Sequence, residues 1–140
     1  MIVVDASVLA PALGDDGVDG DQARSRLRGE SLAAPELIDL EVSSVLRRLL
    51  LSGKLAARRG ELAMADLVAL PLRRVSHRLL LTRCWSLRAN LTIYDASYVA
   101  LAERLGAVLV TADTRLSEAP GLRCEVEVMA RRRRQDEPPP

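Results

Sequence analysis

Aromatic residues, cysteine and histidine are all scarce in this chain of 140 residues. Trp85, Tyr94 and Tyr98 are the only aromatic residues, and phenylalanine is absent. The sequence therefore offers no platform of rings of the kind that grips single-stranded nucleic acid. The two cysteines belong to no CxxC or Cys/His pattern, and His77 is the only histidine, which argues against zinc and haem sites.

A long hydrophobic run and an excess of charge of either sign are also missing. No stretch approaches the ~20 apolar residues that a membrane span requires, and Asp5 interrupts the first apolar run, so no signal peptide is visible. The formal net charge is only +1, from 20 basic and 19 acidic residues. Any attraction for RNA must therefore come from a local patch. We expect a soluble, cytoplasmic protein with no membrane partner.

What the chain does contain is short apolar strands that alternate with helical segments. The length is that of one domain, and the alternation predicts parallel strands with right-handed crossovers, an α/β sandwich. The predicted strands cover residues 2–4, 32–34, 72–75, 108–110 and 125–129. The predicted helices cover residues 7–13, 21–28, 35–51, 55–69, 77–88 and 93–105, and residues 14–20 form a loop. Pro35 is expected at the first position of its helix. Thr92 and Gly106 are expected to cap the two ends of the last helix.

The last ten residues have a different composition. Arg131 to Arg134 form a block of charge, and the chain ends in three prolines. Such a segment cannot bury apolar surface. We expect one folded domain over residues 1–130 and a disordered tail over residues 131–140. The arginine block is more typical of a solvated tail than of an arm that binds nucleic acid.

Two carboxylates are expected close to the hydrophobic core. An ionised carboxylate in such a place is unfavourable unless it is paired or binds a metal ion. Asp5 and Asp113 each follow an apolar strand at the carboxyl edge, where open parallel sheets bind ligands. The alternative is that each caps the next helix, but two strands that end alike favour a shared site. The glycine-rich segment is expected to leave four further acids in water, and they are Asp15, Asp16, Asp19 and Asp21.

Two further acids are ambiguous. Thr92 and Asp95 fit a capping box, whereas a wheel at ~100° per residue places Asp95 in the buried arc with Tyr98, opposite a wet face. Glu103 and Arg104 mark that wet face. In the helix over residues 35–51, Glu41 lies on one shoulder of the buried stripe and Asp39 lies on the other. Periodicity does not choose between them.

Carboxylate and hydroxyl oxygens without histidine or cysteine suit a hard cation, Mg²⁺ or Mn²⁺. Carboxylates that gather together repel one another and take up protons unless a cation neutralises them. The most natural chemistry of such a cluster is hydrolysis of a phosphodiester.

Four segments carry a resemblance to a known family, and they are IVVDAS (2–7), PELIDLEV (35–42), LTIYDASYVALA (91–102) and VLVTADTRL (108–116). In order and spacing they resemble the PIN-domain nucleases, and closely the toxin half of bacterial VapBC-type toxin–antitoxin pairs, over residues 1 to about 128. The resemblance implies a PIN-like three-layer sandwich with a five-stranded parallel sheet flanked by helices. It also implies a Mg²⁺-dependent endoribonuclease (Mn²⁺ is the other candidate) that acts as the toxin of a type II system.

The resemblance assigns roles to individual residues. Asp5 and Asp95 look like the principal metal ligands and Asp113 looks like a further ligand. Glu41, rather than Asp39, would orient metal-bound water or the base, which completes a catalytic set of four acids. Ser7 and Thr111 would be hydroxyl partners beside the ligands.

The resemblance also implies an RNA substrate, a cognate VapB-type antitoxin and a homodimer. Leucines at 49–51 and 79–81 fall on more than one helix face, which suggests a buried partner surface. Arg115 is near the site in the sequence, but no arginine is assigned to RNA. The alternative function is a non-catalytic module with the same fold that binds RNA or its partner without cutting. The complete set of acids counts against it.

Overall fold

A parallel β-sheet of five strands forms the centre of the protein, in the order β3-β2-β1-β4-β5. A computed structural model describes residues 1–130, and the expected tail, 131–140, lies outside the described residues. The strands are β1 Ile2–Val4, β2 Leu32–Pro35, β3 Leu72–Val75, β4 Val108–Thr111 and β5 Val126–Val128. Ile2 pairs with Leu32 on one side and with Val108 on the other. The central strand β1 is fully buried, as expected where helices cover both faces of a parallel sheet.

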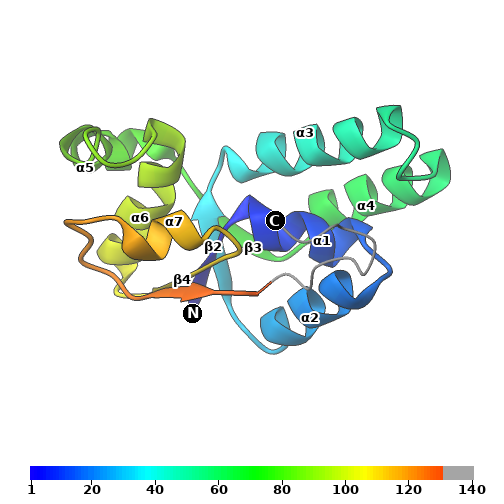
Figure 1. Cartoon of the computed structure of the whole chain (residues 1–140), viewed down its shortest axis with the longest axis horizontal. Coiled ribbons are helices and arrows are strands. Elements are labelled where there is room, and N and C mark those ends of the chain that lie inside the picture. Colours follow the sequence, from blue (N-terminus) through cyan, green and yellow to red (C-terminus); the bar gives the residue numbers. More distant parts are fainter. Residues whose placement is uncertain (131–140) are drawn as a thin grey trace, which may run out of the picture.

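Helices lie on both sides of the sheet and complete three layers (Figure 1). They are α1 Ala6–Gly14, α2 Val18–Leu27, α3 Ile38–Leu51, α4 Ala57–Ala69, α5 Leu81–Ser86, α6 Ile93–Leu105 and α7 Thr114–Glu118, with a 3₁₀ turn at His77–Leu80. Helix α6 packs against β1, β2 and β4, whereas α1 packs against β4 and against α2, α3 and α4. The predicted α/β sandwich with a five-stranded parallel sheet is therefore confirmed. Among the helices of residues 1–130, none is both long enough and apolar enough to cross a bilayer.

Helix α6 is the central helix of its layer, and both of its ends are as predicted. The Thr92 hydroxyl accepts a hydrogen bond from the Asp95 amide, and Gly106 ends the helix in the left-handed region with φ 60°. All seven residues from Ala96 to Ala102 are buried. The expected wet face was wrong at Glu103, because this carboxylate is 11% exposed and forms an ion pair with Arg83 at 2.8 Å.

Three element predictions need correction. Pro35 is the last residue of β2, opposite Val75, so α3 begins at Ile38 instead of at the proline. The helix predicted over 77–88 is divided into the 3₁₀ turn and α5. Helix α2 starts at Val18, inside the predicted loop, because Gly20 packs directly on α1's end: a Cβ at this position would lie 1.8 Å from the Asp15 carbonyl oxygen.

Candidate active site

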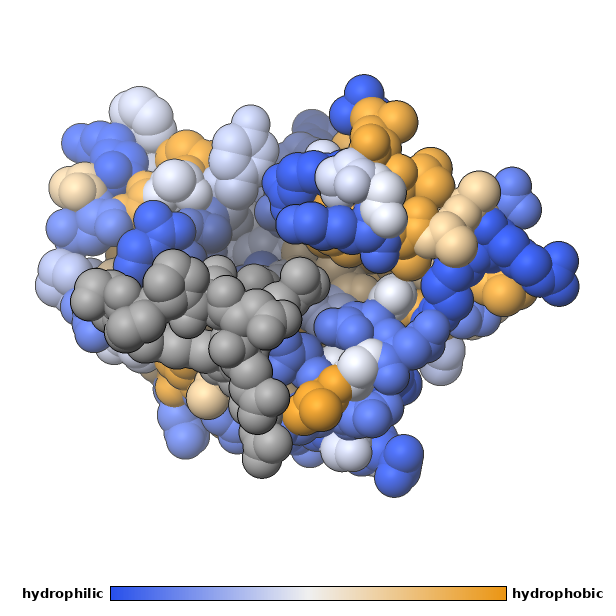
Figure 2. Space-filling view, turned by 45° about the vertical axis from the view of Figure 1, so that its right-hand side comes forward, coloured by the Kyte–Doolittle hydropathy of each residue, from blue (hydrophilic) through white to orange (hydrophobic). Residues whose placement is uncertain are grey.

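The four acids Asp5, Glu41, Asp95 and Asp113 line one cavity of about 890 Å³. Asp5 follows β1 and Asp113 follows β4, and these strands are parallel neighbours with Val4 opposite Val110. Glu41 and Asp95 come from the first turns of α3 and α6. In Figure 2 the surface is hollowed between the side that carries α3 and the side that carries α6 and α7. Four elements that are distant in the sequence thus place carboxylates around a common space.

Asp5 is held by two hydroxyl groups. Its side chain is 8% exposed, and its Oδ2 accepts hydrogen bonds from Ser7 Oγ at 2.8 Å and from Thr111 Oγ1 at 2.7 Å. It makes no side-chain capping bond to α1, so the alternative interpretation of Asp5 as a helix cap is wrong. Neither hydroxyl uses Oδ1, which leaves this oxygen for another partner.

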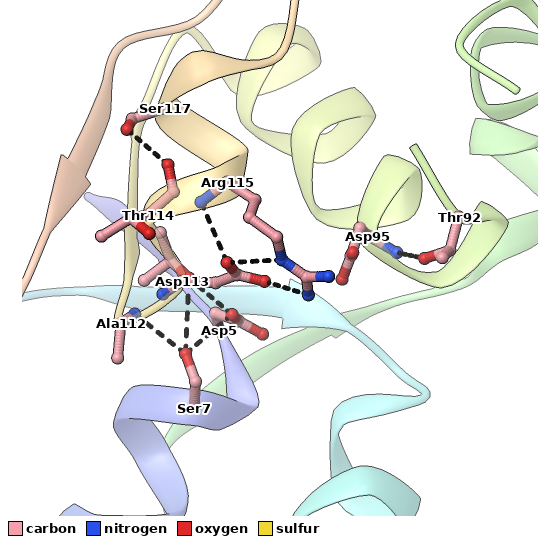
Figure 3. A network of polar contacts seen from close by, with 10 residues as sticks. Asp5, Ser7, Thr92, Asp95, Ala112, Asp113, Thr114, Arg115 and Ser117 are labelled. Carbon is pink, nitrogen blue, oxygen red and sulfur yellow. Dashed lines mark hydrogen bonds and ion pairs between the residues drawn. The ribbon is translucent and has the colours of Figure 1, made fainter. Parts of the chain in front are cut away.

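Ser7 and Thr111 also join the two strand ends to each other. Their hydroxyl oxygens lie 3.3 Å apart. The Ala112 amide donates to Ser7 Oγ at 2.9 Å, and the Asp113 amide donates to Thr111 Oγ1 at 3.1 Å (Figure 3). The two hydroxyls therefore fix the chain after β4 against the start of α1, and with it the relative positions of Asp5 and Asp113.

Asp113 combines a place at the cavity with the role of a cap. Its Oδ1 accepts from the Arg115 amide at 3.0 Å, so the capping interpretation holds for this residue. The same carboxylate accepts two bonds from the Arg115 guanidinium, Nε to Oδ1 at 3.1 Å and Nη2 to Oδ2 at 2.8 Å (Figure 3). The cavity therefore has a guanidinium at the Asp113 side.

Glu41 and Asp95 are half-buried, and the negative charges of neighbouring acids affect their pKa values. Burial raises the pKa of Glu41, a hydrogen bond from Tyr98 lowers it, and the charges of Asp5 and Asp95 raise it. Burial also raises the pKa of Asp95, and the charge of Asp5 adds to this effect. Burial therefore disfavours the ionised form of both acids, and the like charges of their neighbours add to this effect.

The neighbouring acid on α3 lies in different surroundings. Asp39 is absent from the cavity lining, and its Oδ2 accepts a hydrogen bond from Arg74 Nε at 2.7 Å. The structure thus places Glu41 with Asp5 and Asp95, and it places Asp39 in a separate ion pair.

Tyr98 belongs to the site although the sequence did not single it out for a functional role. It is 1% exposed and donates a hydrogen bond from its hydroxyl to Glu41 Oε1 at 2.7 Å. Burial raises the pKa of Tyr98, and the charge of Glu41 raises it further, so the hydroxyl keeps its proton. A signal was available, because a tyrosine three residues after Asp95 lies on the same face of α6 and a buried hydroxyl needs a partner.

Two further acids that were expected in water line the same cavity. Asp15 and Asp19 are half-buried, and Arg48 of α3 is the arginine of the lining. The physical reason is the packing of α1 on α2, which brings the intervening turn and the first turn of α2 to the cavity. Negative charge therefore extends beyond the four predicted acids.

The donors fit a hard divalent cation, since they are carboxylate and hydroxyl oxygens gathered at one cavity. As the side chains lie, the described residues contain no group of three carboxylate, histidine or cysteine side chains that could hold one ion. Asp113 is turned to Arg115 and Glu41 to Tyr98. A shared ion would require Asp113 to exchange its partner.

Comparison with known proteins shows the family to which the chain belongs. The sequence model of the PIN domain matches residues 2–122. VapC ribonuclease Mb0985 of Mycobacterium bovis is 46% identical over 131 residues, which are 94% of this chain and 100% of the relative. Ribonuclease VapC1 of Mycobacterium tuberculosis is 40% identical over 128 residues, 91% of this chain and 96% of the relative. The chain belongs to the PIN-domain family. Its similarity over the full length of such relatives places it among the VapC ribonucleases, and the resemblance seen in the sequence is confirmed.

Solved structures share the fold at low sequence identity. A crystal structure of Mycobacterium tuberculosis VapC20, described as a Sarcin-Ricin loop cleaving toxin, has a TM-score of 0.67 at 16% identity and covers 84% of this chain and 94% of its own. VapBC2 from Rickettsia felis, bound to a DNA fragment from the promoter, has a TM-score of 0.63 at 13% identity, with 91% and 98% covered. These similarities support the three-layer architecture.

Proposed function

We propose that this VapC-type chain is the toxin of a type II toxin–antitoxin pair and an endoribonuclease that hydrolyses RNA phosphodiesters with Mg²⁺, or with Mn²⁺ in its place. Its catalytic residues are Asp5, Glu41, Asp95 and Asp113, within one domain over residues 1–130. The observation that carries the proposal is the meeting of these four carboxylates, from four elements, at one cavity. The relatives named as ribonucleases that match nearly the whole chain support the choice of RNA as substrate.

Asp5, Asp95 and Asp113 would hold the cation. Bound there, the ion would supply positive charge to the phosphate oxygens and lower the pKa of the attacking water. Ser7 and Thr111 prepare Asp5 for this role, because both hydroxyls donate to Oδ2 and fix the orientation of the carboxylate.

Glu41 would accept the proton of the attacking water. Tyr98 holds Oε1 by a hydrogen bond of 2.7 Å, which orients the carboxylate and leaves Oε2 for the proton. Half-burial raises the pKa of Glu41, and a base works best when its pKa approaches the working pH. Water then attacks the phosphorus in line with the leaving oxygen, and Glu41 takes a proton of the water as the new P–O bond forms. The bond between phosphorus and the leaving oxygen breaks, and the leaving oxygen takes a proton from solvent.

The first test is cleavage of structured RNA with Mg²⁺ and with EDTA, followed by sequencing of the new RNA ends. Asp5→Asn and Asp95→Asn should each reduce Mg²⁺-dependent cleavage at least about 100-fold with an unchanged circular dichroism spectrum. Asp39→Asn is the matched control, because this acid lies on the same helix as Glu41 but outside the cavity, and Glu41→Gln should cost far more activity. Full activity of either asparagine variant, or greater loss from Asp39→Asn than from Glu41→Gln, would end the assignment.

Partner proteins would occupy the apolar surface that the monomer leaves exposed. Over α3 and α4 the exposed apolar residues are Leu40, Leu50, Leu51, Leu62 and Val68. Figure 2 shows hydrophobic residues gathered at its upper right, where these helices lie. A second group around α5 and the start of α6 comprises Leu79, Leu81, Trp85, Ile93 and Tyr94. Patches of this kind mark protein interfaces, and they support a homodimer together with a VapB-type antitoxin. Light scattering of the chain alone and with its antitoxin measures both assemblies.

A further inference from the structure

Arg115 holds the carboxylate of Asp113 at the edge of the cavity. The guanidinium binds in bidentate fashion, with Nε 3.1 Å from Oδ1 and Nη2 2.8 Å from Oδ2. Figure 3 shows it extended from Asp113 in the direction of Asp95. The arginine therefore binds one of the proposed cation ligands and points toward another.

The cavity needs such a positive group if RNA is to enter. Its described lining contains six carboxylates, Asp5, Asp15, Asp19, Glu41, Asp95 and Asp113, and one arginine, Arg48. Arg48 is seven residues beyond Glu41 on α3, about 10 Å along the helix. A phosphodiester that approaches the four catalytic acids is repelled by them. Among the described residues, Arg115 touches one of these acids and can offset that repulsion.

The ion pair between Arg115 and Asp113 is suited to exchange. The arginine side chain is 83% exposed and that of Asp113 is 24% exposed, and pairs in such contact with water are held weakly. A divalent cation competes for the same carboxylate oxygens. A guanidinium released from a carboxylate keeps its planar fork, which matches two oxygens of a phosphate equally well.

We propose that Arg115 is a phosphate-binding residue that exchanges Asp113 for a phosphate of the RNA when a divalent cation binds Asp113. This inference rests on the proposed function and adds to it a substrate contact made by the chain itself. It has two consequences of opposite sign. Loss of Arg115 removes a competitor of the cation, so the cation binds more tightly. The same loss removes a phosphate contact, so RNA binds more weakly.

Binding measurements test both consequences without dependence on cleavage. RNA binding is measured by fluorescence anisotropy in Mg²⁺ on a Glu41→Gln background, which keeps the three proposed ligands. Addition of Arg115→Ala should weaken RNA binding about tenfold and reduce the slope of log K against log salt by about 0.7, the value of one contact to a single strand. Arg115→Lys should retain the slope and recover part of the affinity. Calorimetry with Mn²⁺ on the otherwise wild-type chain should show severalfold tighter binding for Arg115→Ala.

Arg104→Ala is the matched control, because Arg104 is an exposed arginine of α6 outside the cavity lining. Equal RNA affinity and salt slope in the Arg115→Ala and Arg104→Ala variants would overturn the assignment. Weaker RNA binding without tighter Mn²⁺ binding would also overturn it, because Arg115 would then not exchange its partner. Failure of the proposed function would appear separately, as absence of Mg²⁺-dependent cleavage by the wild-type chain.

Discussion

At the scale of single residues, environment separates acids that the sequence pattern treats alike. Glu41 and Asp39 are two positions apart on α3, yet Glu41 is bonded to Tyr98, 57 residues away, and Asp39 to Arg74, 35 residues away. The stripe of apolar residues along α3 shows only which side of the helix is buried. It therefore could not indicate which of the two acids belongs to the site. The choice depends on which element packs over each shoulder, and that is decided by the tertiary structure.

The contact between Tyr98 and Glu41 leads to a prediction about pH. The tyrosine hydroxyl lowers the pKa of Glu41 because it stabilises the ionised carboxylate. Tyr98→Phe removes this donor, so the pKa of Glu41 rises and a higher pH is needed to ionise the base. We expect the acidic limb of the profile of kcat/KM against pH to move to higher pH, with about tenfold lower kcat.

The control for this experiment is Tyr94→Phe. Tyr94 is on the same helix, but it is 68% exposed. Its replacement should leave the profile unchanged. An unchanged acidic limb in Tyr98→Phe would mean that Glu41 does not serve as the base whose ionisation limits the rate.

At the scale of secondary structure, the sequence predicted those elements whose limits are local. The strands agree with the structure to within about one residue at each end, because each is a short apolar run, and α6 has both of its predicted caps. The predicted limits are wrong where a contact with a residue distant in the sequence determines where the element begins or ends. Pro35 remains in β2 because the strand pairs with β3, and α7, which the sequence did not predict, is a five-residue helix that begins at the Asp113 cap.

The start of α2 gives the prediction at this scale. Gly20 is helical although the sequence suggested a loop, and a Cβ there would meet the Asp15 carbonyl oxygen at 1.8 Å and the carbonyl carbon at 2.7 Å. Backbone atoms cannot yield as a side-chain tip can. Gly20→Ala should therefore lower the free energy of unfolding by about 3 kcal/mol, measured by urea denaturation. Ser25→Ala, at an exposed position of α2, should change it by less than about 0.5 kcal/mol, and equal effects would refute the close contact.

At the scale of the whole molecule, the acids are the feature that connects fold and function. A chain of net charge +1 concentrates six carboxylates at one cavity. The sequence indicated Asp5 and Asp113 because strand ends meet at one sheet edge, and it indicated Asp95 through the helical wheel. It did not indicate Asp15, Asp19 or Tyr98, since their places depend on helix packing. The concentration of charge should cost the protein stability when no cation is present.

This cost gives a prediction that links pH and metal. The pKa values of Glu41 and Asp95 are raised in the folded protein, so the folded state holds these protons more tightly than the unfolded chain does. Their contribution to stability is therefore lost as the pH rises from the ordinary pKa through the raised folded one. Without metal, Glu41→Gln should melt about 3 °C above the wild type at pH 7.5. Near pH 4 the two proteins should melt alike, because Glu41 is then also neutral.

Mg²⁺ should reverse this loss of stability. At 100 times its Kd it stabilises the wild type by about 2.7 kcal/mol, whereas Asp5→Asn should gain far less. Equal melting temperatures of the wild type and Glu41→Gln at pH 7.5 would show that Glu41 is not destabilised by its neighbours, and a Mg²⁺ effect that Asp5→Asn retains in full would place the cation elsewhere.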